Sequence, residues 1–151
     1  MQRFLSYFSF RARANRQRYW MTVLSIFGLF IVSVFVAGML ALAPLLALVI
    51  IPVWLALFVA NLANAVRRLH DRNKSAWWLL LFMGVPTLFL LPASLANASS
   101  DPGAAAFGAL CGLISLPFSI WAFVEMGCLR GTAGPNKYGD DPLQPAAEVF
   151  A

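Results

Sequence analysis

The chain has 151 residues, of which 61% are hydrophobic and 11% are charged, and its formal net charge is +5 at pH 7. Soluble globular domains carry about 25% charged residues and about 45–50% apolar ones. The composition therefore argues against a water-soluble enzyme, a disordered linker or a disulfide scaffold. It predicts a membrane protein with a single domain.

The first long uncharged stretch covers residues 19–66, which contain no Asp, Glu, Lys or Arg. One helix needs about 20 apolar residues to cross about 30 Å of hydrocarbon, so this stretch is long enough for two. Gly38 and Pro44 mark the turn between them, because both residue types interrupt helices. We expect the first two spans at about 19–40 and 45–66.

Two further uncharged stretches follow, at residues 76–100 and 102–124. They predict a third span at about 76–96 and a fourth at about 103–129, the latter with Glu125 inside it. The predicted fold class is an all-α membrane protein, a bundle of four transmembrane helices arranged as two helical hairpins.

Local signals mark the helix starts and the bends within the helices. Asn15, Ser75 and Asp101 are expected to cap the first, third and fourth helices. Prolines inside the second, third and fourth helices should bend them locally; these are Pro52, Pro86 and Pro117.

Three regions follow from this division. Residues 1–18 form a basic and aromatic segment at the membrane interface, 19–129 the four-helix domain, and 130–151 a tail that we expect to be disordered after Leu143.

The 11 Lys and Arg residues are distributed unevenly around the predicted spans. They lie before the first span, between the second and third, and after the fourth: Arg3, Arg11, Arg13, Arg16, Arg18, Arg67, Arg68, Arg72, Lys74, Arg130 and Lys137. Because cytoplasmic loops carry an excess of Lys and Arg, we expect both termini in the cytoplasm. The same topology explains the positive charge, so we expect anionic lipid head groups as partners and no nucleic acid.

The segment before the first span begins with aromatic side chains and continues with arginines. A short helix in the membrane interface would bury Phe4, Tyr7 and Phe8 and leave the arginines to meet phosphates. Two interpretations stay open: a docking surface for a lipid or a partner, and an anchor that only fixes the topology.

Residues 67–75 are dense in charge and hold the only histidine. His70 beside Asp71 suggests acid–base chemistry, because a carboxylate can orient an imidazole. No nucleophile is evident, however, and a structural loop held by pairs of arginine and carboxylate is the favoured interpretation. A single histidine is too few for an ordinary metal site, so we expect no metal and no cofactor.

The fourth predicted span carries a strip of small residues. Gly108 and Gly112 form the pattern G-x-x-x-G, which lets helices approach closely, either within the chain or in a homodimer. Glu125 continues the strip, and an ionisable residue at membrane depth is a functional candidate. A structural pair with Arg67 or Arg68 is the simpler interpretation.

Two polar residues and two cysteines complete the intramembrane candidates. Asn61 and Asn64 share a face of the second span with Arg68, where they would form a polar patch facing Glu125. The two cysteines, Cys111 and Cys128, lie about 25 Å apart along one helix, so free thiols are expected.

The tail at residues 131–142 consists of turn-forming residues with one aromatic. We expect it to fold back so that Asp140 and Asp141 pair with the basic loops.

Three motifs together carry a family resemblance: SFRARANRQRYW at residues 9–20, RRLHDRNKSAWW at 67–78 and GPNKYGDDP at 134–142. In this order they resemble the bacterial inner-membrane family catalogued as domain of unknown function 805. That family usually has glycine where this chain has Ala12 and Ala76. The resemblance implies a small polytopic protein of the inner membrane whose distinctive residues lie on the cytoplasmic side, and it implies no reaction.

We therefore expect a non-enzymatic interaction protein with a basic cytoplasmic face that contacts anionic lipid or a partner in a membrane complex. The candidates on this face are Arg11, Arg13, Arg67, Arg68, His70, Asp71, Lys74, Asn136, Lys137 and Tyr138. The alternative is a small transporter or channel, acting as a dimer, that uses Glu125, Asn61 and Asn64. An enzyme that acts on lipid head groups through His70 and Asp71 is the least favoured hypothesis.

Overall fold

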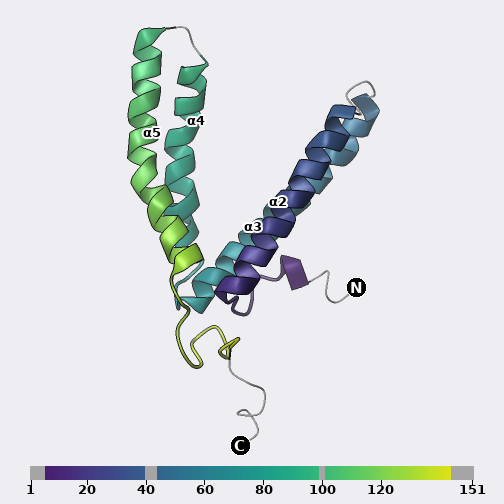
Figure 1. Ribbon diagram of the computed structural model, residues 1–151, viewed down its shortest axis with the longest axis vertical. Coiled ribbons are helices and arrows are strands. Elements are labelled where there is room, and N and C mark those ends of the chain that lie inside the picture. The colour runs from purple at the N-terminus through teal and green to yellow at the C-terminus, as the bar shows by residue number, and fades with distance from the viewer. Residues whose placement is uncertain (1–5, 40–43, 99–100, 144–151) are drawn as a thin grey trace, which may run out of the picture. The chain divides into compact units, whose positions relative to one another are not determined.

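The computed structural model describes residues 6–39, 44–98 and 101–143. This part of the chain is helical and contains no strand, apart from one isolated bridge in the tail. Its elements are the 3-10 helix η1 (Ser6–Phe8), α2 (Arg16–Met39), α3 (Pro44–Asp71), the π-helical η2 (Leu80–Gly84), α4 (Val85–Asn97), α5 (Pro102–Phe123) and the π-helical η3 (Val124–Cys128). Figure 1 labels the four α-helices.

The chain divides into two compact units. Unit 1 combines Met1–Asn73 with Arg130–Ala151, and unit 2 is Lys74–Leu129. The C-terminal segment thus belongs to the same unit as the N-terminal half of the chain.

In unit 1, α2 and α3 pack side by side (Figure 1). The predicted cap is confirmed at the start of α2, where Asn15 Oδ1 accepts a hydrogen bond from the N–H of Arg18 at 2.8 Å. Farther along, Trp54 Nε1 donates to Ser33 Oγ at 2.9 Å and so joins the two helices within their apolar stretch. The predicted turn between them falls partly on residues 40–43, outside the described ranges.

In unit 2, α4 packs against α5 (Figure 1). The predicted cap of α5 is confirmed, since Asp101 accepts a hydrogen bond from the N–H of Ala104 at 2.8 Å. The third helix differs from the prediction, because the N–H of Trp78 bonds to the carbonyl of Ser75 and regular helix starts only after this tight turn. The π-helical η2 then precedes Pro86, whose missing N–H interrupts the α-helical ladder.

Within the described ranges, three helical segments are long and apolar enough to cross a membrane: Arg16–Met39, Ile50–Asp71 and Pro102–Cys128. The helix at the predicted third span, Leu80–Ala96, is also apolar but shorter than these, because the turns before it take up part of the predicted span. The expectation of four helices is therefore confirmed among the described residues, whereas a fourth crossing stays a prediction.

Burial is concentrated at one end of α3. Along most of the helices large apolar side chains are exposed, as lipid-facing side chains would be, for example Phe35 at 73% and Leu95 at 74%. At the C-terminal end of α3 the fully buried side chains are instead mostly polar, and they include Asn64, Arg68 and Asp71. A buried polar cluster needs internal partners, and these position the candidate site.

Candidate functional site

Asp71, the last residue of α3, is buried and holds two arginines. Its Oδ1 lies 3.1 Å from Nη2 of Arg13, and its Oδ2 accepts a hydrogen bond from Nη1 of Arg68. Both arginine side chains are almost fully buried, at 1% and 0% exposure. Two guanidinium groups thus share one carboxylate, and loss of that carboxylate would remove the negative charge that both of them contact.

The N-terminal segment is fixed to α3 by its main chain. The N–H of Ala14 donates to the carbonyl of Arg67 at 3.1 Å, and Arg68 Nη1 donates to the carbonyl of Ala14 at 3.3 Å. Ala12 has φ +76°, in the left-handed region that a residue with a side chain seldom adopts. The chain therefore turns sharply just before Arg13 enters the cluster.

The tail folds back onto the same cluster. The guanidinium of Arg13 donates to tail carbonyls, among them that of Thr132. The N–H of Thr132 donates in turn to the carbonyl of Asp71 at 2.8 Å, and Asn136 Nδ2 donates to the carbonyl of His70 at 2.9 Å. The sequence suggested that the tail folds back through its carboxylates, but the groups that bind Arg13 here are mainly backbone carbonyls.

Two residues of the tail, Gly131 and Asp141, help to fix its path beside the cluster. A Cβ on Gly131 would lie only 2.0 Å from Oδ2 of Asp71, so a larger residue at this position would displace the carboxylate. Asp141 accepts hydrogen bonds from the N–H groups of Leu143 and Gly134, each at 3.0 Å. These two bonds hold the pKa of Asp141 below its ordinary value.

His70 and Tyr138 stack face to face beside the cluster. Their ring centroids are 3.8 Å apart and the ring planes differ by 6°. Nδ1 of His70 is buried and has no hydrogen-bond partner among the described residues, so Asp71 does not orient the imidazole. The adjacent His70 and Asp71 therefore do not form the acid–base pair that their order in the sequence suggested.

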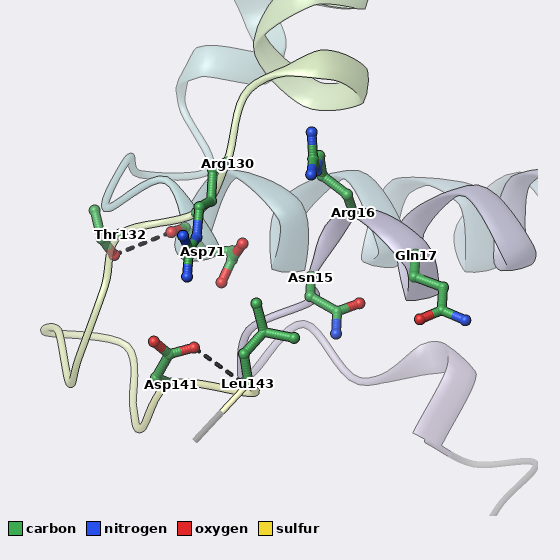
Figure 2. A pocket seen from close by; sticks show the side chains of 9 residues that line it. Asn15, Arg16, Gln17, Asp71, Arg130, Thr132, Asp141 and Leu143 are labelled. Carbon is green, nitrogen blue, oxygen red and sulfur yellow. Dashed lines mark hydrogen bonds between the residues drawn. The ribbon is translucent and has the colours of Figure 1, made fainter. Parts of the chain in front are cut away.

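A cavity of about 320 Å³ adjoins the cluster in unit 1 (Figure 2). Its walls come from the start of α2, the end of α3 and the tail. The lining residues are Asn15, Arg16, Gln17, Asp71, Arg130, Gly131, Thr132, Asp141 and Leu143. Most of the residues that line the cavity are therefore polar or charged.

Unit 2 contains a second buried carboxylate, Glu125 in η3, which is 5% exposed. Its Oε1 lies 3.0 Å from Nζ of Lys74, and the same ammonium lies 4.2 Å from the ring centroid of Trp78. Glu125 thus has a positively charged partner within its own unit. Its predicted pair with Arg67 or Arg68 would join the two units and stays a prediction.

The two asparagines of α3 have different surroundings. Asn64 is fully buried, and its Nδ2 donates to the carbonyl of Tyr19 at 3.2 Å, which ties α3 to α2. Asn61 is half-buried and lines a separate apolar cavity of about 340 Å³ between the same two helices. The predicted polar patch facing Glu125 would join the two units and stays a prediction.

The small residues of α5 serve packing only in part. Gly108 is buried, whereas a Cβ on Gly112 would meet no described atom within 4 Å. The two cysteines are free, as expected, with Cys111 buried and Cys128 exposed.

The predicted basic face is thus divided by the structure. Six of its members gather around the cluster in unit 1: Arg13, Arg68, His70, Asp71, Asn136 and Tyr138. Arg67 is also buried in unit 1, where its Nε donates to the carbonyl of Ala63. Arg11 and Lys137 are exposed, and Lys74 belongs to unit 2. Gly131 and Thr132 also contact Asp71, although neither was predicted as a site residue. Their place among the turn-forming residues after the last predicted span is a signal for a tight return of the chain.

Comparison with known proteins places this chain among inner-membrane relatives. A family model described as protein of unknown function (DUF805) matches residues 7–140. The inner membrane protein YhaI of Escherichia coli strain K12 is 32% identical over 149 residues, which cover 94% of this chain and 96% of the relative. The inner membrane protein YhaH of the same strain is 30% identical over 156 residues, 93% of each chain. No solved structure matches this chain.

Proposed function

The chain belongs to the DUF805 family of proteins of unknown function, and from this premise we propose a small multi-pass inner-membrane protein that binds anionic lipid head groups and catalyses no reaction. Its inner-membrane relatives and its apolar helices identify it as a protein of the inner membrane. The proposal adds four crossings, both termini in the cytoplasm and a lipid-binding cytoplasmic face.

One observation carries the proposal: besides three buried arginines, unit 1 has several exposed basic side chains among its described residues. Three arginines are buried at the end of α3, namely Arg13, Arg67 and Arg68. Five other cations of the same unit are exposed: Arg11, Arg16, Arg18, Arg130 and Lys137. Groups of 4–8 basic residues beside a membrane attract anionic lipids by about 1 kcal/mol each.

The position of these cations supports lipid as the partner. α2 begins at Arg16 and is apolar enough to span a membrane, so its first turn lies at the level of the head groups. A partner protein in a membrane complex, or a second copy of this chain, would meet the same charges.

The enzyme hypothesis has less support. His70 is stacked on Tyr138, and the carboxylate of Asp71 is engaged with Arg13 and Arg68. A general base must reach the proton that it abstracts, and neither side chain is available for this in unit 1.

The orientation is tested with single cysteines in a variant that lacks Cys111 and Cys128. Ala98→Cys, at the exposed end of α4, should react with an impermeant maleimide in intact spheroplasts. Lys137→Cys in the exposed tail should react only after lysis. The reverse pattern would contradict the proposed topology.

Lipid binding is tested on the purified full chain in neutral detergent. Added phosphatidylglycerol should raise the midpoint of thermal unfolding more than phosphatidylcholine does, because a ligand that binds the folded state stabilises it. The difference should shrink at high salt, since exposed charges are screened. Equal stabilisation by both lipids would contradict the proposal.

A second candidate function rests on Glu125. An ionisable residue at membrane depth is often functional, and π-helical segments such as η3 recur at functional sites. A transporter would lose proton-coupled flux in proteoliposomes on Glu125→Gln while remaining folded. The ion pair with Lys74 favours a structural role for this residue.

A further inference from the structure

We propose that the cavity between α2 and α3 binds the ring of an isoprenoid quinone, with the Asn61 amide donating a hydrogen bond to one of the ring carbonyls. This inference goes beyond the proposed function, because the cavity lies in the apolar stretch of unit 1 and not at its basic face. It concerns the binding of a neutral lipid and requires no reaction.

The lining of the cavity suits a flat apolar ring. Its volume is about 340 Å³, within the range of sites for small ligands. Two aromatic side chains from each helix line it, namely Phe27, Phe30, Trp54 and Phe58. All four are at least 41% exposed, so a lipid in the bilayer can reach their rings. Aromatic rings favour stacked or edge-to-face contacts with another ring, which a flexible acyl chain does not offer.

The indole of Trp54 is a fixed part of the wall. Its Nε1 donates to Ser33 Oγ at 2.9 Å, and that hydroxyl donates in turn to the carbonyl of Phe30 at 2.7 Å. The ring centroids of Trp54 and Phe30 are 5.8 Å apart, with an angle of 47° between the ring planes. The donor groups of Trp54 and Ser33 are therefore in use within the protein.

Asn61 supplies the amide in a lining that is otherwise apolar and aromatic. The residue is half-buried and, in contrast to Asn64, its side chain has no hydrogen-bond partner among the described residues. A polar group without a partner in apolar surroundings costs free energy, and a carbonyl oxygen of a ligand would satisfy the amide N–H. The cavity thus favours a ligand that combines a ring with a carbonyl.

The depth of Asn61 favours a quinone over a phospholipid. The apolar segment Ile50–Asp71 has 22 residues, and Asn61 lies at its middle, about 15 Å from either end. This is about half of the hydrocarbon thickness. A phospholipid would have to bring its charged head group toward this depth to place an ester carbonyl there, which is costly. A quinone has no charge and carries its carbonyls on the ring itself.

The experiment uses the full chain in nanodiscs of phosphatidylcholine and a photoreactive azidoquinone as the probe. Mass spectrometry of the labelled peptides should place the label in residues 23–30 and 54–61, and decylubiquinone should compete with it. Label that lies only outside these segments, or that decylubiquinone does not displace, would overturn the site. Because these nanodiscs contain no anionic lipid, the result does not depend on the proposed binding of head groups.

The role of the amide is tested with Asn61→Leu, which removes the donor and retains a similar volume. Decylubiquinone should compete about tenfold more weakly in this variant, because one hydrogen bond in apolar surroundings is lost. Decylbenzene, which has a ring and the same tail but no carbonyl, should compete equally in both proteins. If the two compounds competed equally well in the unaltered chain, the hydrogen bond to the carbonyl would be wrong.

The place of the ring is tested with a matched pair of variants on α2. Phe27→Leu removes a ring that lines the cavity, whereas Phe35→Leu removes an exposed ring that does not. We expect about fivefold weaker competition by decylubiquinone in the first variant and no change in the second. Equal losses would overturn the cavity as the site, and this pair keeps the test decisive if Asn61→Leu fails to fold.

A neutral glyceride is the remaining competitor for the cavity. Dioctanoylglycerol has ester carbonyls and no charge, but it lacks a ring. It should compete with the azidoquinone about tenfold more weakly than decylubiquinone does. Equal competition would overturn the quinone as the ligand and assign the cavity to a neutral glyceride.

Discussion

Among the described residues, each unit contains one buried carboxylate, and the two carboxylates have different partners. In unit 1, Asp71 draws Arg13, Arg68 and the tail together from three distant parts of the sequence. In unit 2, Glu125 pairs with Lys74, whose side chain is 23% exposed and which also contacts the ring of Trp78. The difference indicates that the tertiary structure of unit 1 depends on its buried ion pairs, whereas that of unit 2 depends mainly on helix packing.

The largest effect is expected from Asp71→Asn. The amide has nearly the same shape, but it removes the negative charge that Arg13 and Arg68 both contact in the buried cluster. We expect the free energy of unfolding to fall by about 3–5 kcal/mol. Denaturant titration in detergent measures this loss, and hydrogen exchange should show the amides of residues 130–143 becoming unprotected.

The matched variant in unit 2 is Glu125→Gln. Lys74 keeps partial access to solvent and the face of Trp78, so we expect a loss of only about 1–2 kcal/mol. Exchange in the tail should not change. If both variants destabilised the protein equally, the contrast between the two units would be wrong.

A second test alters the space around Asp71 rather than its charge. In Gly131→Ala the new methyl group would overlap the carboxylate, and overpacking of this kind costs about 1–3 kcal/mol. The matched control is Gly112→Ala in unit 2, where no described atom lies within 4 Å of the added carbon. Thermal unfolding should separate the two, and an unchanged Gly131→Ala would show that the tail approaches less closely than described.

The contrast also explains what the sequence could predict. Apolar runs and capping residues act locally, so the helices and the caps at Asn15 and Asp101 followed from the sequence. The shorter third helix was missed because its boundary depends on the turn at Ser75 and on η2, whose geometry is set by neighbours in space.

The sequence predicted which charged residues belong to the candidate site, but not how they are arranged. Charge counts identified Arg13, Arg68 and Asp71, but the sequence gives no signal that Arg13 binds backbone carbonyls of the tail. Such contacts depend on the path of the main chain and not on residue type. For the same reason Gly131 looked like an ordinary turn residue, although its lack of a side chain makes room for Asp71.

A smaller effect is expected at Ala12, where the resembling family usually has glycine. A residue with a side chain in the left-handed region costs roughly 1–2 kcal/mol, part of which glycine loses again through its freedom in the unfolded chain. We expect Ala12→Gly to stabilise unit 1 by about 0.5–1 kcal/mol. The control Ala14→Gly, at a buried position bonded to Arg67, should instead be destabilising, and a loss of stability in both variants would contradict the role of this turn.

The smallest effect concerns pH and Asp141. Hydrogen bonds from Leu143 and Gly134 hold the pKa of this carboxyl below its ordinary value of 3.8, so its folded form binds a proton less readily than its unfolded form. Its contribution to stability is therefore fully present above pH 3.8 and is lost as the pH falls through the lower pKa of the folded state. Hydrogen exchange at the N–H of Gly134, corrected for intrinsic rates, should show constant protection between pH 7 and pH 5 and lose it only in stronger acid. In Asp141→Asn the protection should already be reduced at pH 7, because the amide accepts these bonds without the charge; unchanged protection in that variant would mean that the turn of the tail does not depend on this carboxylate.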